Sequence, residues 1–212
     1  MRELLPGLYH WQAFNDDISH EVDSYYVVLD QPVLIDPMVP KEGIDWFRQH
    51  GEPTHVFMTN RLHDRGCQEC IDTYGATVWC HRAGLHEFED GLHEFEDGGL
   101  QVTAFDHGDE LPGGVRALEV AVLCPEETAL LVPVTGGALS IGDALVRWEE
   151  KIGFVPDYLL GDDPLAIKIG IRDAFLRICD SYDFDHLLFA HGEPLVGGGK
   201  AELRRYLEGL EG

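Results

Sequence analysis

The chain has 212 residues, enough for one sizeable hydrophobic core, and its 44% hydrophobic content is ordinary for a globular protein. Its 39 acidic and 15 basic residues give a net charge of −24, which opposes binding to nucleic-acid phosphates and to anionic membrane surfaces. No apolar run is long enough to span a bilayer, and the first residues lack the apolar stretch of a secretory signal, so we expect a soluble, cytoplasmic protein.

The first half of the chain alternates short strands and helices. Runs of β-branched and aromatic residues predict strands, and amphipathic stretches that end at a glycine predict helices. We expect strands at residues 7–11, 24–29, 32–35, 54–58 and 77–80, and helices at 41–50 and 66–74. The strand, helix and strand between residues 54 and 80 are typical of a βαβ unit.

Two cysteines of the second expected helix, Cys67 and Cys70, form a C-x-x-C motif. The chain has five cysteines, an odd number, which argues against a disulfide framework. The pair could be a redox site or half of a metal site. We favour two small side chains that pack a helix on a sheet, because free cysteines are usually buried.

An exact tandem repeat of the heptapeptide GLHEFED occupies residues 84–97. Its apolar side chains recur at helical spacing, at Leu85, Phe88, Leu92 and Phe95. His86 and His93, with the glutamates beside them, could hold a cation on one helix face. We favour a single duplication that lengthens a surface helix, because two copies do not make a repeat architecture.

After the repeat, the pattern changes to strands joined by tight turns. We expect strands at 100–105, 115–122, 128–134 and 138–141, then a helix capped by Asp163, a buried strand at 186–190 and a closing helix. No linker rich in Pro, Gly or Ser divides the chain, so we expect a single domain over residues 1–212. This element order suits an α/β fold in which two sheets lie between helix layers.

Several segments, taken in order, resemble the ligand loops of the metallo-β-lactamase superfamily. The segments VLIDP (33–37), FMTNRLHDRG (57–66), LCPEETAL (123–130), LSIGDAL (139–145) and LLFAHGEP (187–194) sit where that superfamily carries L-I-D-x-G, T-H-x-H-x-D-H-x-G, H-T-P-G-S-x-A-L, G-D and G-H-G. Their order and spacing carry the resemblance over most of the chain. It implies a four-layer αββα sandwich, in which Asp36 caps the loop that holds the ligands.

The resemblance also implies that the first of the superfamily's two metal sites is lost. The three histidines of that site fall on Asn60, Leu62 and Leu123. None of these side chains can replace a neutral imidazole as a strong ligand, and two of them are apolar.

The second metal site is partly retained. Its usual ligands fall on Asp64, Arg65, Asp143 and His191, and His63 is expected to point away from them. Asp64, Asp143 and His191 could hold one divalent ion such as zinc, manganese or iron. Alternatively no metal is bound, and Arg65, whose guanidinium stays charged, replaces the metal charge beside the two aspartates.

These residues leave three hypotheses open. The first is a hydrolase of an ester, thioester or phosphoester with at most a mononuclear site, in which Asp64, Arg65, Asp143 and His191 are the catalytic residues. The second is a metal-free module that binds an anionic small molecule through Arg65. In the third, the same four residues form only a buried polar network in a structural domain, which is tolerated when every group is paired.

Overall fold

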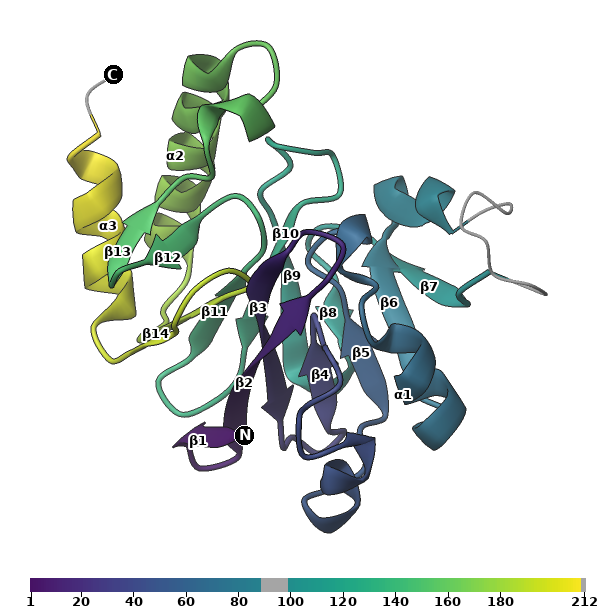
Figure 1. Ribbon diagram of the computed structural model, residues 1–212. Helices are drawn as coiled ribbons and strands as arrows, with labels where there is room; N and C mark the ends of the chain where they lie inside the picture. Colours follow the sequence, from purple (N-terminus) through teal and green to yellow (C-terminus); the bar gives the residue numbers. More distant parts are fainter. Residues whose placement is uncertain (89–98, 211–212) are drawn as a thin grey trace.

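Two β-sheets lie face to face in the middle of the molecule (Figure 1). The computed structural model describes residues 1–88 and 99–210. Within these residues, the first sheet runs in sequence order through β1 (Arg2–Leu5), β2 (Leu8–Asn15), β3 (His20–Val27), β4 (Val33–Ile35), β5 (His55–Phe57), β6 (Thr77–His81) and β7 (Val102–Phe105). The second sheet has the order β15 (Leu195–Val196), β14 (His186–Phe189), β11 (Ala138–Ile141), β10 (Thr128–Val132), β9 (Val115–Glu119) and β8 (Glu110–Leu111). A separate hairpin joins β12 (Val146–Trp148) to β13 (Lys151–Gly153).

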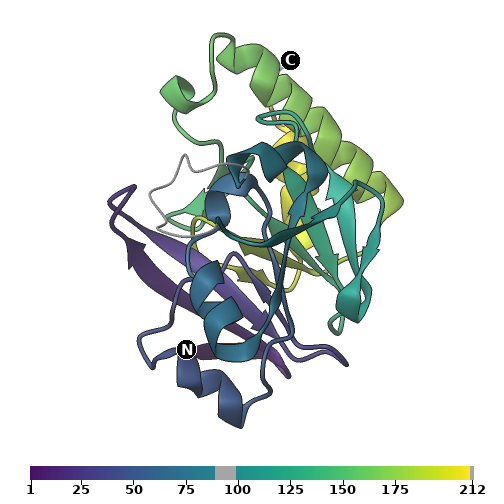
Figure 2. The ribbon, with the colours of Figure 1, turned by 90° about the vertical axis from the view of Figure 1, so that its right-hand side faces the viewer.

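Helices cover the outer faces of both sheets (Figure 2). The α-helices are α1 (Cys67–Tyr74) on the first sheet, and α2 (Pro164–Ser181) and α3 (Gly199–Glu208) on the second. Short 3-10 helices lie in the connections: η1 (Ile44–Gln49), η2 (Arg61–His63), η3 (Arg82–Glu87), η4 (Pro112–Gly114) and η5 (Asp157–Leu159). As expected, the Asp163 carboxylate caps α2, accepting a hydrogen bond from the Ala166 amide at 3.1 Å. None of the described helices is both long and apolar enough to cross a membrane.

Successive side chains along each strand point to opposite faces of the sheet, and this divides the core into three layers. In β3, Tyr25 faces the second sheet whereas Tyr26 faces the layer of α1, because neighbouring strand residues point to opposite faces. Each layer has its own large buried side chains: Phe57 and Leu130 between the sheets, Phe47 under α1, and Phe175 and Phe189 under α2 and α3. The predicted four-layer αββα sandwich is therefore confirmed.

Cys67 and Cys70 lie in the core layer between α1 and the first sheet. Both side chains are buried, and burial raises the pKa of both thiols, that of Cys70 to about 12. Thiols that remain protonated are poor nucleophiles and poor metal ligands. The structure thus agrees with packing as the role of the C-x-x-C motif.

Some elements differ from the sequence-based predictions. The expected helix at 41–50 is the shorter 3-10 helix η1, and the strand expected at 115–122 ends at Glu119. The first copy of the repeat begins within η3, whereas the second copy, at 91–97, lies outside the described residues. The hairpin of β12 and β13 was not predicted, because its turn residues Glu149 and Glu150 adopt φ values of 49° and 63° without the Asn-Gly or Asp-Gly signal of such turns.

Candidate functional site

The candidate site lies where the chain leaves β11 and β14 of the second sheet and β5 of the first. Strands β11 and β14 pair in parallel with Ile141 opposite Phe189, and both side chains belong to the core beneath α2. Asp143 and His191 each follow two residues after these positions, so register alone places them side by side. The loop after β5 approaches from the first sheet and brings His63 to the same edge.

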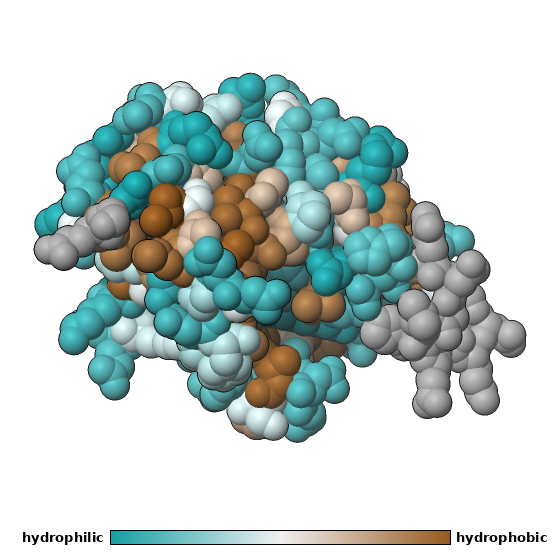
Figure 3. All heavy atoms as spheres, turned by 90° about the horizontal axis from the view of Figure 1, so that it is seen from above, coloured by the Kyte–Doolittle hydropathy of each residue, from teal (hydrophilic) through white to brown (hydrophobic). Residues whose placement is uncertain are grey.

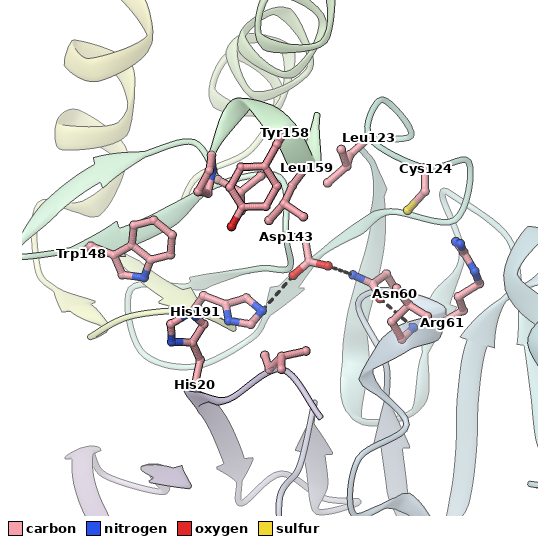
Figure 4. A pocket seen from close by; sticks show the side chains of 14 residues that line it. His20, Asn60, Arg61, Leu123, Cys124, Asp143, Trp148, Tyr158, Leu159 and His191 are labelled. Carbon is pink, nitrogen blue, oxygen red and sulfur yellow. Dashed lines mark hydrogen bonds and ion pairs between the residues drawn. The ribbon is translucent and has the colours of Figure 1, made fainter. Parts of the chain in front are cut away.

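Three ligand-type atoms meet at this edge, in a group that we call the donor cluster: His63, Asp143 and His191. The Nε2 atom of His191 lies 2.9 Å from Oδ1 of Asp143, and Nε2 of His63 lies 3.2 Å from the same oxygen. All three atoms lie within 4.8 Å of one another. Figure 4 shows Asp143 at the centre of the site, with His191 on one side and Asn60 on the other.

Asp36 fixes the orientation of the His63 ring. One Asp36 oxygen accepts the backbone amide of Thr59 at 2.8 Å, and the other accepts the Thr59 hydroxyl at 2.6 Å and lies 3.0 Å from Nδ1 of His63. With Asp36 ionised, Nδ1 of His63 carries a proton, and the ring held in this way points Nε2 at Asp143. Asp36 therefore holds both the start of the loop and the ring that the loop presents.

The two carboxylates and His63 shift one another's pKa values. Burial and Arg65 lower the pKa of His63, but Asp36 and Asp143 raise it more strongly, to about 9. Burial raises the pKa of Asp143, but His63 and His191 outweigh it and hold that pKa well below its usual range. The pKa of Asp36 is also lowered, because His63 and Arg65 outweigh the effect of burial. With no metal bound, His63 is thus an imidazolium between two carboxylates at neutral pH.

Glu127 and Asn60 form a second polar layer behind Asp143. Asn60 Nδ2 donates to Oδ2 of Asp143 at 2.7 Å and lies 3.4 Å from Glu127, whose other oxygen accepts the Ala144 amide at 3.0 Å. Burial, followed by the charge of Asp143, raises the pKa of Glu127 to about 8, so this carboxyl is mostly protonated at neutral pH. Sequence reasoning missed Glu127. The available signal was a glutamate directly before the buried strand β10.

Of the four predicted site residues, the structure brings Asp143 and His191 together but leaves Asp64 out of the donor cluster. The Asp64 carboxylate accepts the backbone amide of Arg65 at 2.9 Å. His63 takes the place expected for Asp64, and the expectation that His63 points away was wrong. From Thr59 to Gly66 the loop has eight residues where the quoted motif has nine, and it winds as the 3-10 turn η2, so the residue that faces Asp143 comes one position earlier.

Arg65 does not pair with either aspartate that was expected beside it. Its guanidinium donates to the backbone carbonyls of Asp23 at 3.1 Å and Asp36 at 3.0 Å. No ion pair joins it to Asp64 or Asp143 within the described residues. The cation that directly faces Asp143 is His63, whereas Arg65 ties two segments of the first sheet together.

The donor cluster has the composition of a site for one divalent ion. Two imidazole nitrogens and one carboxylate oxygen are the protein ligands of many catalytic zinc sites and of mononuclear iron sites with open positions. The carboxylate of Asp36 on the far nitrogen of His63 is the outer partner that ligating histidines usually have. Asn60, Leu62 and Leu123, where the superfamily carries the histidines of its other metal site, do not provide a comparable set of ligands for a second ion. Leu62 and Leu123 line the pocket described next.

A pocket of about 510 Å³ opens directly above the donor cluster. Asp143 and His191 lie at its floor, and its wall is formed mainly by apolar side chains from five segments: Ile18, Leu62, Leu123, Trp148, Tyr158 and Leu159. In the view from above, hydrophobic side chains gather near the middle of the face, surrounded by hydrophilic ones (Figure 3). This size and lining are typical of small-molecule sites.

The loop that carries His191 is held by the first sheet. Asp23 accepts the Gly192 amide at 2.6 Å and contacts His10 Nε2 at 2.6 Å, and its own amide donates to the Ala190 carbonyl at 2.9 Å. Gly192 has a φ of 110°, and a Cβ atom there would overlap the carbonyl oxygen of Arg147. Only glycine therefore fits this position, and Asp23 fixes His191 through the backbone on both sides of it.

No protein-family model and no curated protein matches the sequence. Solved structures do match. A metallo-β-lactamase from Erythrobacter litoralis aligns with a TM-score of 0.67 at 15% identity, over 99% of this chain and 96% of that one. TTHA1623 in a di-iron-bound form gives 0.66 at 20% identity, over 92% and 99%. A Cronobacter sakazakii metallo-β-lactamase described by a HARLDQ motif gives 0.60 at 16% identity, over 88% and 75%. The chain thus has the metallo-β-lactamase fold, as its sequence motifs predicted.

Proposed function

We propose that this chain is a hydrolase of an ester, thioester or phosphoester that uses one divalent metal ion held by His63, Asp143 and His191. The observation that carries the proposal is the donor cluster: three ligand atoms lie within 4.8 Å of one another, and two of their residues, Asp143 and His191, line the pocket. An ion bound there would polarise a carbonyl or phosphoryl oxygen and supply an activated water near neutral pH.

The surrounding residues have distinct parts in this proposal. Asn60 orients Asp143 by donating to the oxygen that does not face the histidines. Asp36 keeps the proton of His63 on Nδ1 and so leaves Nε2 for the ion. Arg65 is a positioning residue, because its guanidinium donates to backbone carbonyls, and the Asp64 carboxylate accepts the Arg65 amide instead of joining the three ligands.

A metal-free small-molecule-binding or structural module is the second candidate, and one observation favours it. His63, with a pKa of about 9, already neutralises Asp143 when no metal is bound. The positive charge first expected from Arg65 is then supplied by His63. In this alternative, the ion pair of His63 and Asp143 is permanent and the pocket binds its ligand without a metal.

Metal titration of chelator-treated protein distinguishes the two candidates. We expect one Zn²⁺, Mn²⁺ or Fe²⁺ per chain to survive dialysis, measured by elemental analysis, and one Co²⁺ to give a visible absorption band. His63→Gln and Asp143→Asn should lose the ion. Asp64→Asn should keep it, and so should His20→Gln, which changes a pocket histidine outside the donor cluster.

The outcomes separate clearly. One bound ion together with hydrolysis of a chromogenic ester, thioester or phosphoester supports the hydrolase. Wild-type protein that binds no ion at pH 8, where a folded control metalloprotein is loaded under the same conditions, refutes it and leaves the metal-free module. Loss of the ion in Asp64→Asn but not in His63→Gln would show that the ligand assignment is wrong.

A further inference from the structure

The pocket wall is unusually apolar for a protein of this charge. Trp148 and Leu159 line the pocket and remain 49% and 53% exposed, although the chain as a whole carries a net charge of −24. They come from the β12–β13 hairpin and from η5, and Leu62, from η2 in the loop after β5, lines the same pocket. Large apolar side chains gathered around one opening mark a surface that binds an apolar group.

The charged groups at the pocket do not favour an anion. Arg61 is the one arginine or lysine of the lining within the described residues, and its guanidinium is paired with Glu126 and, at 3.1 Å, with Glu87. At the floor, Asp143 already forms an ion pair with His63. Arg65, on which the expectation of an anionic ligand depended, does not line the pocket. Apart from an ion held by the donor cluster, an anionic ligand would therefore lose its hydration without gaining an unpaired arginine or lysine from the lining.

We propose that the pocket selects a neutral substrate with a large apolar group beside the bond to be cleaved, which means an apolar ester or thioester rather than a phosphoester. This inference rests on the proposed function and names its substrate class. In Figure 4 the apolar side chains stand on both sides of Asp143, with Trp148 on one side and Leu123 on the other. The scissile bond would lie over the donor cluster while its apolar substituent lies along either wall.

Binding of a matched pair of probes tests the inference without the metal. Octanamide and octanoate have the same chain and differ in charge, and Trp148 is placed to report on either of them by its fluorescence. In chelator-treated protein at pH 8, we expect octanamide to shift Trp148 emission to shorter wavelength and to bind at least tenfold more tightly than octanoate. Hexanamide should bind roughly tenfold more weakly than octanamide, because two methylene groups are left unburied. Trp148→Phe should abolish the spectral signal and so identify its source.

Two leucines of similar exposure provide the matched variants. Leu159→Ser should weaken octanamide binding at least fivefold, measured by calorimetry. Leu165→Ser should leave binding unchanged, because Leu165 is 62% exposed at the start of α2 but does not line the pocket. Octanoate that binds as tightly as octanamide overturns the inference, and so does a folded protein that binds neither probe.

Failure of the inference and failure of the proposed function remain distinguishable. If octanamide binds but the metal-loaded protein cleaves neither octanoyl nor acetyl esters, the proposed function fails and the ligand class stands. If the loaded protein cleaves a phosphoester or acetyl ester while octanamide does not bind, the hydrolase stands and the apolar substrate class fails.

Discussion

Protonation of His63 should link the stability of the metal-free protein to pH. The ring lies buried between Asp36 and Asp143, which together raise its pKa from 6.5 to about 9. A histidine whose pKa is raised on folding stabilises the native state while it is protonated. The stabilisation is fully present below pH 6.5 and is lost as the pH rises through 9.

The size of this change in unfolding free energy follows from the shift in the pKa of His63. At roughly 1.4 kcal/mol per unit of pH, a rise from 6.5 to about 9 corresponds to about 3 kcal/mol of unfolding free energy. We expect urea unfolding in chelator to show that loss between pH 6.5 and 9.5. His63→Gln, which cannot titrate, should be less stable at pH 7 and should lose this part of the pH dependence.

Nitrogen-15 NMR of the histidine rings gives an independent measurement if His63→Gln does not fold. The His63 ring should titrate near pH 9 in chelator, and added zinc should abolish that titration by displacing the proton from Nε2. A His63 ring that titrates near 6.5, or a fall in stability that persists in full in His63→Gln, would refute the electrostatic account of the donor cluster.

Three further predictions concern the residues around the donor cluster. Arg65→Ala should lower the unfolding free energy by about 2–4 kcal/mol, because two buried backbone carbonyls lose their donor. Added zinc should not restore this stability. A melting temperature that zinc restores would instead support Arg65 as a substitute for the metal. Gly192→Ala should destabilise the protein by about 2 kcal/mol or more and weaken Co²⁺ binding, because the added carbon overlaps the Arg147 carbonyl. Gly153→Ala is the control and should melt like the wild type, because no atom lies near its added carbon. Relative to the wild type, Glu127→Gln should gain stability as the pH rises from 4.5 to about 8, because over this range the Glu127 carboxyl is ionised in the unfolded chain but still holds its proton in the folded one, whereas the amide does not titrate. A difference in urea midpoint between variant and wild type that is the same at pH 5 and pH 9 would contradict this.

Local patterns in the sequence predicted most strands and the helices α1, α2 and α3, because their periodicity reports directly on which side is buried. The meeting of Asp143 and His191 was also predictable, since both follow parallel neighbouring strands at the same offset. Which of His63 and Asp64 joins them was not predictable from the sequence. It depends on how a short loop winds, and a change of one position there turns a different side chain toward the site.

Two other features depend on contacts between distant segments. Glu127 acquires its raised pKa from burial against Asp143, which no local pattern reveals. Trp148 reaches the pocket through a hairpin whose turn consists of two glutamates, residues that usually indicate an exposed helix or loop rather than a β-turn. The substrate-facing wall was therefore the part of the site least accessible from the sequence.

The donor cluster is divided between the two sheets, and this has a consequence for the order of events during folding. His63 comes from the loop after β5, and Asp143, 80 residues further along the chain, comes from the loop after β11. Contacts between segments this far apart form only after costly loop closure, so the ligands meet when the sheets dock. A metal ion would consequently enter a finished site through the pocket, and its capture would slow unfolding of the docked sheets without accelerating their assembly.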